Sequence, residues 1–236
     1  MKIVSYNVLA DCYVKPEMFP LVRPEHLDRG YRRRLLIERL VGYAADVICL
    51  QEVEEEVFGE LQTRLTGYQG VLARKGGGKP DGCATFVRGR SASHQPRPYS
   101  DGTGHVALVT LLEDVAVVNT HFKWGSATSR VGLDQAVELL DGLDSGVDWI
   151  VCGDFNAAPD SALVAEFHRR GFADAYASIG GDTCNSNSTP KRIDYFMHRG
   201  LRSMPLPLPA IDGRTPLPSE TEPSDHLAIR ATFARV

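Results

Sequence analysis

The feature of this sequence that most constrains its fold is a short apolar run that ends in a carboxylate. Trp149 to Cys152 is β-branched and aromatic and is too short for a helix, which predicts a buried strand. Gly153 permits a close turn, so Asp154 and Asn156 emerge at the carboxyl end of that strand, before a helix that Pro159 can start. Open α/β sheets carry their chemistry at this position, although a simple turn stabilised by its own Asp and Asn side chains is an alternative interpretation.

The same arrangement recurs elsewhere in the chain, and this recurrence argues against the simple turn. One buried strand ends in Glu52, and another ends in His121. Near the end of the chain, Asp225 and His226 come directly before an alternating apolar strand. Packing alone does not explain why independent strands each deliver a metal-binding or proton-handling side chain at one end. We therefore predict that these side chains meet at one edge of a sheet.

Apolar periodicity divides the chain into strands and four helices. Strands are expected at 1–8, 45–52, 84–88, 106–112, 115–120, 149–152, 192–198 and 227–233. A tight Glu113-Asp114 turn is expected between 112 and 115. Helices are expected at 31–45, after Glu52, at 133–143 and between Pro159 and Gly171. This alternation predicts packed sheets with helices outside, but the spacing does not distinguish them from one doubly wound sheet. The arginines at 32–34 are interpreted as a solvated helix face, residues 76–82 as a flexible loop, and residues 201–222 as an irregular flap over the site.

Length and composition are those of one ordinary globular domain. The chain has 236 residues, a hydrophobic content of 43%, a charged content of 24% and a formal net charge of −4. This charge excludes a broad basic surface that would coat long nucleic acids. The five cysteines are scattered and include no Cys-x-x-Cys pair, which argues against a zinc or disulfide framework and favours a reducing compartment. Without a signal peptide or a membrane-spanning run, we expect a cytoplasmic location.

Six short motifs follow one another along nearly the whole chain: Asn7, Gln51-Glu52, Asn119-Thr120-His121, Gly153-Asp154-Phe155-Asn156, Arg192-Ile193-Asp194-Tyr195 and Ser224-Asp225-His226. In this order they resemble the endonuclease/exonuclease/phosphatase superfamily. A closer similarity, to the deadenylase, nocturnin and angel group, rests on Ser5–Ala10, Asp81–Phe86, Leu133–Gln135 and Pro223–Leu227. The resemblance implies a DNase I-like four-layer α/β sandwich, with two packed mixed β-sheets flanked by helices, as a single catalytic domain over residues 1–236. It also implies Mg²⁺-dependent cleavage of phosphate esters in RNA or nucleotides.

The acidic residues of these motifs point to a bound cation. If Glu52, Asp154 and Asp225 converge on one pocket, two charges about 4 Å apart repel by roughly 4 kcal/mol at an effective dielectric constant of about 20. Such a cluster is stable only with a cation or with shared protons. Oxygen ligands with one histidine favour Mg²⁺ or Mn²⁺ over zinc.

The resemblance also assigns roles to the individual residues. It implies that Glu52, with Asn7 beside it, holds the main ion, while Asp154, Asn156 and His226 hold a second ion or the attacking water. We expect Asp154 to orient or deprotonate this water and Asn156 to hydrogen-bond the developing oxyanion. We expect His226 to be a histidinium held by Asp194 and to bind the phosphate. His121 is expected to donate to another phosphate oxygen, and Asp225 to position the leaving group or a metal-bound water. One ion and two ions are both compatible with this pattern.

The sequence departs from the deadenylase pattern in the segments that would bind the base. Deadenylases hold adenine between a proline after the strand-end histidine and a phenylalanine before the Ile-Asp-Tyr stretch, and this chain has neither. The positive charges of Lys123, Lys191 and Arg192 instead favour an extra phosphate near the scissile bond. Trp124 is a candidate for stacking on a base, with a core tryptophan as the alternative.

Two other functions compete with the phosphodiesterase. The same chemistry could act on a phosphomonoester such as an inositol or sphingolipid head group, and the fold could also serve as a non-catalytic scaffold. The scaffold predicts losses among the motif residues, and none is missing. We therefore expect RNA or a nucleotide as the partner, with no membrane, no obligate protein partner and a monomeric state. The exact substrate and an exo or endo mode of attack stay open.

Overall fold

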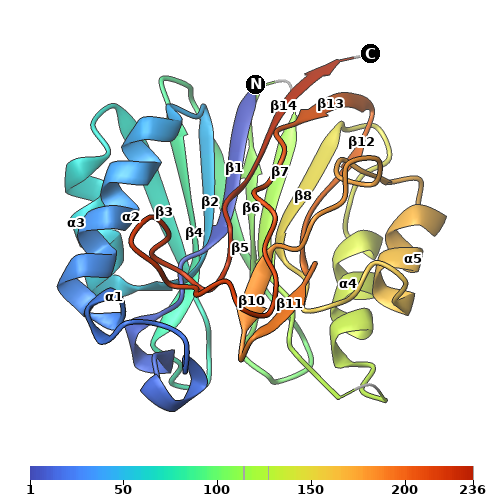
Figure 1. Cartoon of the computed structure of the whole chain (residues 1–236). Helices are drawn as coiled ribbons and strands as arrows, with labels where there is room; N and C mark the ends of the chain where they lie inside the picture. Colours follow the sequence, from blue (N-terminus) through green and yellow to red (C-terminus); the bar gives the residue numbers. More distant parts are fainter. Residues whose placement is uncertain (114, 127, 236) are drawn as a thin grey trace.

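A computed structural model of the chain, covering residues 1–113, 115–126 and 128–235, contains two six-stranded sheets that pack on each other (Figure 1). The first sheet has the spatial order β13 (Leu201–Pro205), β14 (Ile229–Arg235), β1 (Lys2–Asn7), β2 (Val47–Glu54), β4 (Asp81–Arg88) and β3 (Tyr68–Arg74). The second has the order β5 (Ser93–Pro98), β6 (Val106–Leu111), β7 (Ala116–His121), β8 (Trp149–Asp154), β12 (Asp194–Arg199) and β9 (Ala173–Asp174). A separate hairpin joins β10 (Cys184–Ser186) to β11 (Thr189–Lys191).

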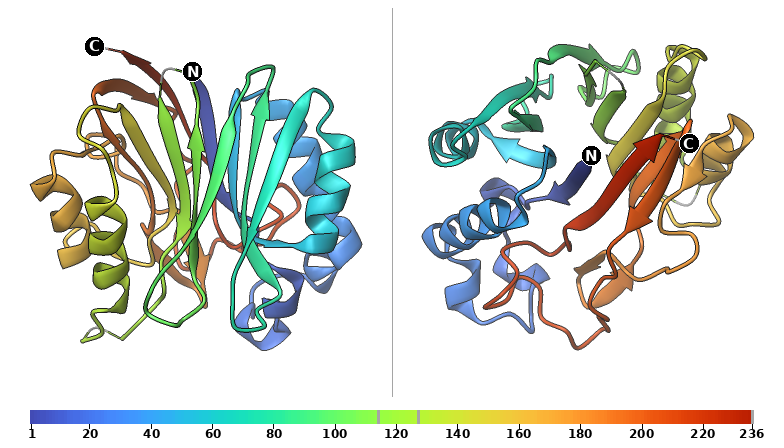
Figure 2. Two further views of the ribbon diagram at one scale, coloured as in Figure 1. Left: turned by 180° about the vertical axis from the view of Figure 1, so that it is seen from behind. Right: turned by 90° about the horizontal axis from the view of Figure 1, so that it is seen from above.

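Helices cover the outer face of each sheet (Figures 1 and 2). On the first sheet these are α2 (Arg29–Tyr43) and α3 (Glu55–Arg64), and on the second they are α4 (Val131–Asp141) and α5 (Ala162–Arg169). Three short turns of helix, η1 (Asp11–Tyr13), η2 (Pro16–Met18) and α1 (Pro24–Leu27), connect β1 to α2. The four-layer α/β sandwich predicted from the sequence is therefore confirmed, and the single doubly wound sheet is excluded.

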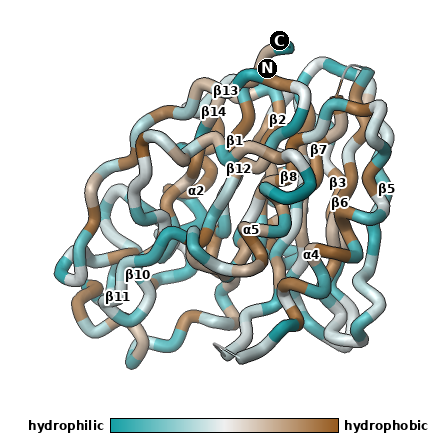
Figure 3. The backbone as a smooth tube through the Cα atoms, turned by 90° about the vertical axis from the view of Figure 1, so that its right-hand side faces the viewer, coloured by the Kyte–Doolittle hydropathy of each residue, from teal (hydrophilic) through white to brown (hydrophobic). Residues whose placement is uncertain are grey.

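The alternation of side chains along β8 explains why its sequence is apolar throughout. Trp149 and Val151 face the core beneath α4 and α5, whereas Ile150 and Cys152 face the core between the two sheets. Successive strand residues point to opposite faces, and here both faces are buried. Figure 3 shows hydrophobic residues along β6 and in part of α4.

Strand direction brings the motif residues to one edge of the sandwich. In the first sheet β1 runs parallel to β2, with Asn7 opposite Gln51, and in the second β7 runs parallel to β8, with His121 opposite Asp154. A polar contact between the sheets fixes their alignment just below this edge, because Gln51 Nε2 donates to Asn119 Oδ1 at 2.7 Å. The carboxyl ends of four strands from two sheets therefore face one another.

Several expectations from the sequence were wrong. The edge strands β3 and β5 were not predicted, and part of the expected flap is β13, which pairs with β14. Arg32 is buried, with 4% of its surface exposed, so the expected solvated arginine face is wrong at this position. Asp114 of the expected tight turn lies outside the described residues. In the part of the chain that the structure describes, no helix has the length and apolar character needed to span a bilayer.

Candidate active site

The two sheets meet at a bridge made by Asn7. Its Nδ2 donates to Glu52 Oε1 at 3.1 Å, across to β2, and to Asp154 Oδ2 at 3.0 Å, on the other sheet. Its Oδ1 accepts the backbone N–H of Leu9 at 3.0 Å. Asn7 thus presents its amide nitrogen, not its oxygen, to the carboxylates. Asn7 therefore bridges the two carboxylates, and its expected role as a metal ligand stays a prediction.

Unusual backbone geometry orients the side chains around the Asn7 bridge. Leu9, Glu52 and Asn156 all have positive φ angles, of 56°, 59° and 50°. For residues other than glycine this left-handed conformation is strained and concentrates at functional sites. Glu52 lies where the register between β2 and β4 shifts, and such bulges redirect a side chain. The turn at Leu9 directs the N–H of Ala10 to Glu52 Oε2 at 3.0 Å.

His226 lies between two aspartates. Its Nδ1 is 2.9 Å from Asp194 Oδ2, and its Nε2 is 3.7 Å from Asp154 Oδ2. Asp194 Oδ2 also accepts the hydroxyl of Thr183 at 2.6 Å. All four side chains are buried. The structure therefore brings together Asp154, Asp194 and His226, which the sequence placed on three separate segments.

Burial changes the proton affinities of these groups. Burial raises the pKa of Asp154 to about 7, with His226 opposing the shift and Asp194 adding to it. Burial also raises the pKa of Glu52, although the charge of Lys75 opposes this. For His226, burial alone lowers the pKa, but the Asp194 carboxylate outweighs it and the pKa is raised well above its ordinary value. The site thus holds one imidazolium and two carboxyls that resist ionising together.

A divalent cation fits this donor set. One ligand atom from each of Asp154, Asp194 and His226 lies within 4.8 Å of the others, and Asn7 joins Glu52 to the same group. The carboxylate oxygens of Glu52 and Asp154 suit Mg²⁺ or Mn²⁺, while the imidazolium of His226 remains a hydrogen-bond donor. A cation would also offset the cost of burying these carboxylates, which is the main cause of their raised pKa values.

The surroundings of His121 differ from the expectation. Asn156 Nδ2 lies 3.0 Å from both Phe122 O and His121 Nε2, and contact with a carbonyl oxygen identifies this atom as the nitrogen. The amide hydrogens of Asn156 are therefore engaged, and donation to an oxyanion would require one of them to be released. His121 Nε2 lies beside this amide, and its expected donation to a phosphate oxygen stays a prediction. Burial, followed by the charge of Lys75, lowers the pKa of His121 well below its ordinary value and keeps the ring neutral.

The sequence analysis missed a buried ion pair beside this histidine. Lys75 Nζ lies 2.6 Å from Asp81 Oδ2 and 3.4 Å from His121 Nδ1, and Tyr13 donates its hydroxyl to Asp81 Oδ1 at 2.9 Å. Both charged side chains are almost fully buried. Lys75 follows the unpredicted strand β3 and Asp81 begins β4. The only signal in the sequence was their position at strand ends flanking the glycine-rich loop.

The other predicted residues lie around the rim and the wall of the site. Lys123, Trp124 and Lys191 are exposed, with 64% of the Trp124 surface accessible, which excludes a core tryptophan. Arg192 instead forms an ion pair with buried Asp174, so we no longer assign it a substrate contact. Asp225 is buried, and its Oδ2 accepts the hydroxyl of Ser186 at 2.6 Å.

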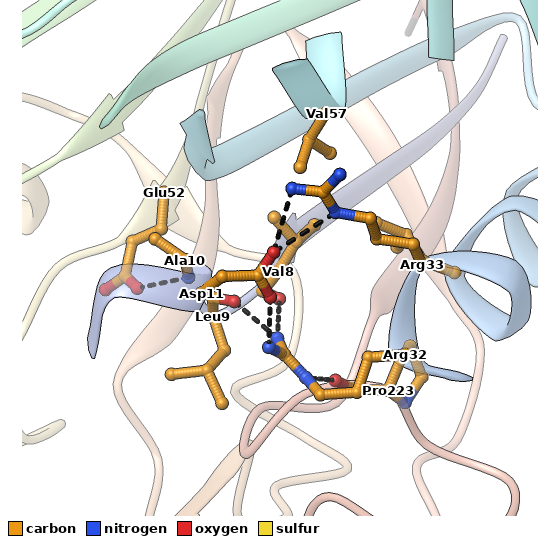
Figure 4. A pocket seen from close by; sticks show the side chains of 10 residues that line it. Val8, Leu9, Ala10, Asp11, Arg32, Arg33, Glu52, Val57 and Pro223 are labelled. Carbon is orange, nitrogen blue, oxygen red and sulfur yellow. Dashed lines mark hydrogen bonds and ion pairs between the residues drawn. The ribbon is translucent and has the colours of Figure 1, made fainter. Parts of the chain in front are cut away.

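A second charged cluster lies behind the Asn7 turn (Figure 4). Arg32 donates from Nε to Pro223 O at 2.7 Å and from Nη2 to Val8 O at 2.8 Å and to Leu9 O. Its Nη1 pairs with Asp11 at 2.8 Å. Arg32 therefore ties the turn that follows Asn7 to the segment that precedes His226.

A cleft of about 380 Å³ adjoins Asn156. Its charged and hydroxyl-bearing lining residues are Lys123, Ser126, Thr128, Ser129, Arg130 and Ser161. The cleft is thus polar and basic, which suits an anionic ligand.

A family model, curated relatives and solved structures all match this chain. A family model described as the Endonuclease/Exonuclease/phosphatase family matches residues 4–226. The CCR4-Not complex 3'-5'-exoribonuclease subunit Ccr4 of Candida albicans is 28% identical over 70% of this chain and 28% of that protein, and nocturnin of Xenopus laevis is 29% identical over 99% and 72%. The solved structure of ANGEL2, a 2',3'-cyclic phosphatase, in complex with adenosine-2',3'-vanadate superposes with a TM-score of 0.87 at 21% identity, covering 98% of this chain and 94% of that one. The chain spans about a third of the length of the plant and fungal relatives it matches.

Proposed function

Because this chain belongs to the endonuclease/exonuclease/phosphatase family, we propose that it is a phosphoric ester hydrolase, a Mg²⁺- or Mn²⁺-dependent phosphodiesterase acting on RNA or nucleotide ends. The observation that carries the proposal is the convergence of Asp154, Asp194 and His226 within 4.8 Å, with Glu52 joined to them through Asn7. The exoribonuclease among its relatives supports RNA as the substrate class.

Each residue of the site would have its own role in the hydrolysis. Asp154, buried at 3.7 Å from His226 Nε2, would orient a water molecule and accept its proton. His226, held as an imidazolium by Asp194, would donate to a phosphate oxygen. Glu52 and Asp154 would hold the cation, which offsets charge on the phosphate oxygens when bound. Asp225, which is buried in the wall of the site, would position the leaving group.

The rim of the site suits a negatively charged chain. Lys123 and Trp124 leave β7 beside the basic cleft, and Lys191 lies exposed on the β10–β11 hairpin. A lysine provides charge for an adjacent phosphate, and an exposed tryptophan provides a face for a base. We therefore propose a substrate with a base and a phosphate on opposite sides of the scissile bond.

A substrate panel tests the proposal. Hydrolysis would be measured with Mg²⁺ and with Mn²⁺ on poly(A), RNA ending in a 2',3'-cyclic phosphate, 2'–5' oligonucleotides, dinucleotides, duplex DNA and inositol phosphates. We expect activity on the single-stranded RNA ends or dinucleotides, and the product ends distinguish 3'-end trimming from cyclic phosphate removal.

The Asp154→Ala protein serves as the blank. Activity that survives this substitution would overturn the assignment of the site. Activity confined to inositol phosphates would replace the phosphodiesterase with a phosphomonoesterase, and inactivity on every substrate with either ion would favour a scaffold.

A further inference from the structure

A thiol lies next to the catalytic histidine. Cys184 Sγ, a carboxylate oxygen of Asp225 and a ring nitrogen of His226 lie within 4.8 Å of one another. All three residues are buried, with 1%, 6% and 5% of their surfaces exposed. The proposed hydrolysis uses the acid and the histidine but has no role for the sulfur.

The backbone holds these three side chains together. Cys184 and His226 are opposite each other in an antiparallel bridge, and the N–H of Asn185 donates to Asp225 O at 2.8 Å. Ser186 Oγ lies 3.1 Å from Cys184 Sγ and 2.6 Å from Asp225 Oδ2. Opposed residues of an antiparallel pair point to the same face, so the thiol and the imidazole are aligned by the strands.

We propose that Cys184, Asp225 and His226 form a site for a thiophilic divalent cation such as Zn²⁺, which inhibits the enzyme by withdrawing His226 from the phosphate. Sulfur, nitrogen and oxygen together are the donors that zinc selects, whereas Mg²⁺ avoids sulfur. From Zn–S and Zn–N bonds of about 2.3 and 2.0 Å, the donors of a tetrahedral site lie roughly 3.5 Å apart. The observed separations therefore require the side chains to close by only about 1 Å.

The neighbouring residues suit this site. His226 Nδ1 already donates to Asp194 at 2.9 Å, which leaves Nε2 for a cation. Zinc-bound histidines commonly donate their other ring N–H to a carboxylate in this way. Ser186 donates its hydroxyl to Asp225 at 2.6 Å, and the Cys184 thiol and the His226 imidazolium each release a proton to solvent as the cation binds.

The binding arm of the test does not depend on catalysis. Cd²⁺ added to the purified protein should produce a thiolate-to-metal charge-transfer absorption, and Zn²⁺ should displace it. Cys184→Ser should abolish the absorption and weaken Zn²⁺ binding at least tenfold in competition titrations. Cys12→Ser, which removes an exposed thiol on η1, should leave both unchanged. A band that persists in Cys184→Ser, or no band in the wild type, would overturn the site.

The inhibition arm rests on the proposed function. With saturating Mg²⁺, Zn²⁺ should inhibit the wild-type and Cys12→Ser proteins, and Cys184→Ser should need at least ten times more Zn²⁺. Cys184→Ala would repeat the comparison should the serine variant not fold, as judged by circular dichroism. Equal inhibition of wild type and variant would overturn the inhibitory role even with the Cd²⁺ band present. If the enzyme is inactive on all substrates, the absorption still decides the site while the proposed function fails.

Discussion

Two buried charged clusters lie on either side of the turn after Asn7, and they differ in how their charges are matched. Arg32 is surrounded by the carbonyls of Val8, Leu9 and Pro223 and by Asp11, so its donors are engaged. On the other side, Asp154 and Glu52 share the neutral amide of Asn7, and burial raises both carboxyl pKa values.

This difference separates a structural cluster from a functional one. A buried ion whose partners are complete stabilises the surrounding backbone and has no capacity left for a ligand. Buried carboxylates with incomplete partners are held at an energetic cost that a cation or a reacting group can relieve. The cluster around Arg32, in which the charges are matched, therefore supports the geometry of the unmatched cluster of Glu52 and Asp154.

The largest effect is expected from removing the central carboxylate of the unmatched cluster. Asp154→Asn should lower kcat by roughly 10³-fold or more, because it removes the proton acceptor and a cation ligand together. Single-turnover hydrolysis of the best substrate measures this, with circular dichroism to verify folding. A loss of less than tenfold would place the chemistry elsewhere.

Removing the centre of the matched cluster should affect stability. Arg32→Ala leaves the buried carbonyls of Val8, Leu9 and Pro223 without this donor, so we expect a loss of about 3 kcal/mol in the free energy of unfolding. Urea denaturation measures it. The control is Arg34→Ala, from the same arginine run but exposed, which should change stability by under about 0.5 kcal/mol. Similar losses in both variants would contradict the contrast between the clusters.

The pH dependence of cation binding tests the raised pKa of Asp154. Since the folded pKa of about 7 lies above the unfolded value, the folded state holds a proton between about pH 4 and 7 that the unfolded state has lost. This contribution stabilises the metal-free protein at low pH and is lost as the pH rises through 7. A cation must displace the same proton, so its affinity should weaken roughly tenfold per pH unit below 7. Calorimetry with Mn²⁺ at pH 5.5, 6.5 and 7.5 measures this, and a flat profile would contradict it.

The sequence predicted the parts of this contrast that depend on local patterns. Strand-end acids such as Glu52 and Asp154 could be found because short apolar runs define strands, and the parallel pairs place their ends at one edge. The burial of Arg32 could not be predicted, since it depends on the carbonyl of Pro223, 191 residues away along the chain, as well as on the nearer carbonyls of Val8 and Leu9. The amide directions of Asn7 and Asn156 are likewise set by neighbours from other segments, so the sequence alone could not predict them.

The smallest effect is expected at the rim of the site, where the adjacent residues Lys191 and Arg192 also differ in whether their charge is paired. Arg192 is paired with Asp174 and stacked at 5.0 Å from the ring centroid of Tyr195, whereas Lys191 is exposed. Lys191→Ala should raise KM for RNA about three- to tenfold without changing kcat, with a steeper effect at low salt, because it removes one phosphate contact. Arg192→Ala should instead lower the melting temperature and leave the salt dependence of KM unchanged. If Arg192→Ala alone altered that salt dependence, the matched ion pair would be a substrate contact after all, and pairing would not distinguish structural from functional charges in this protein.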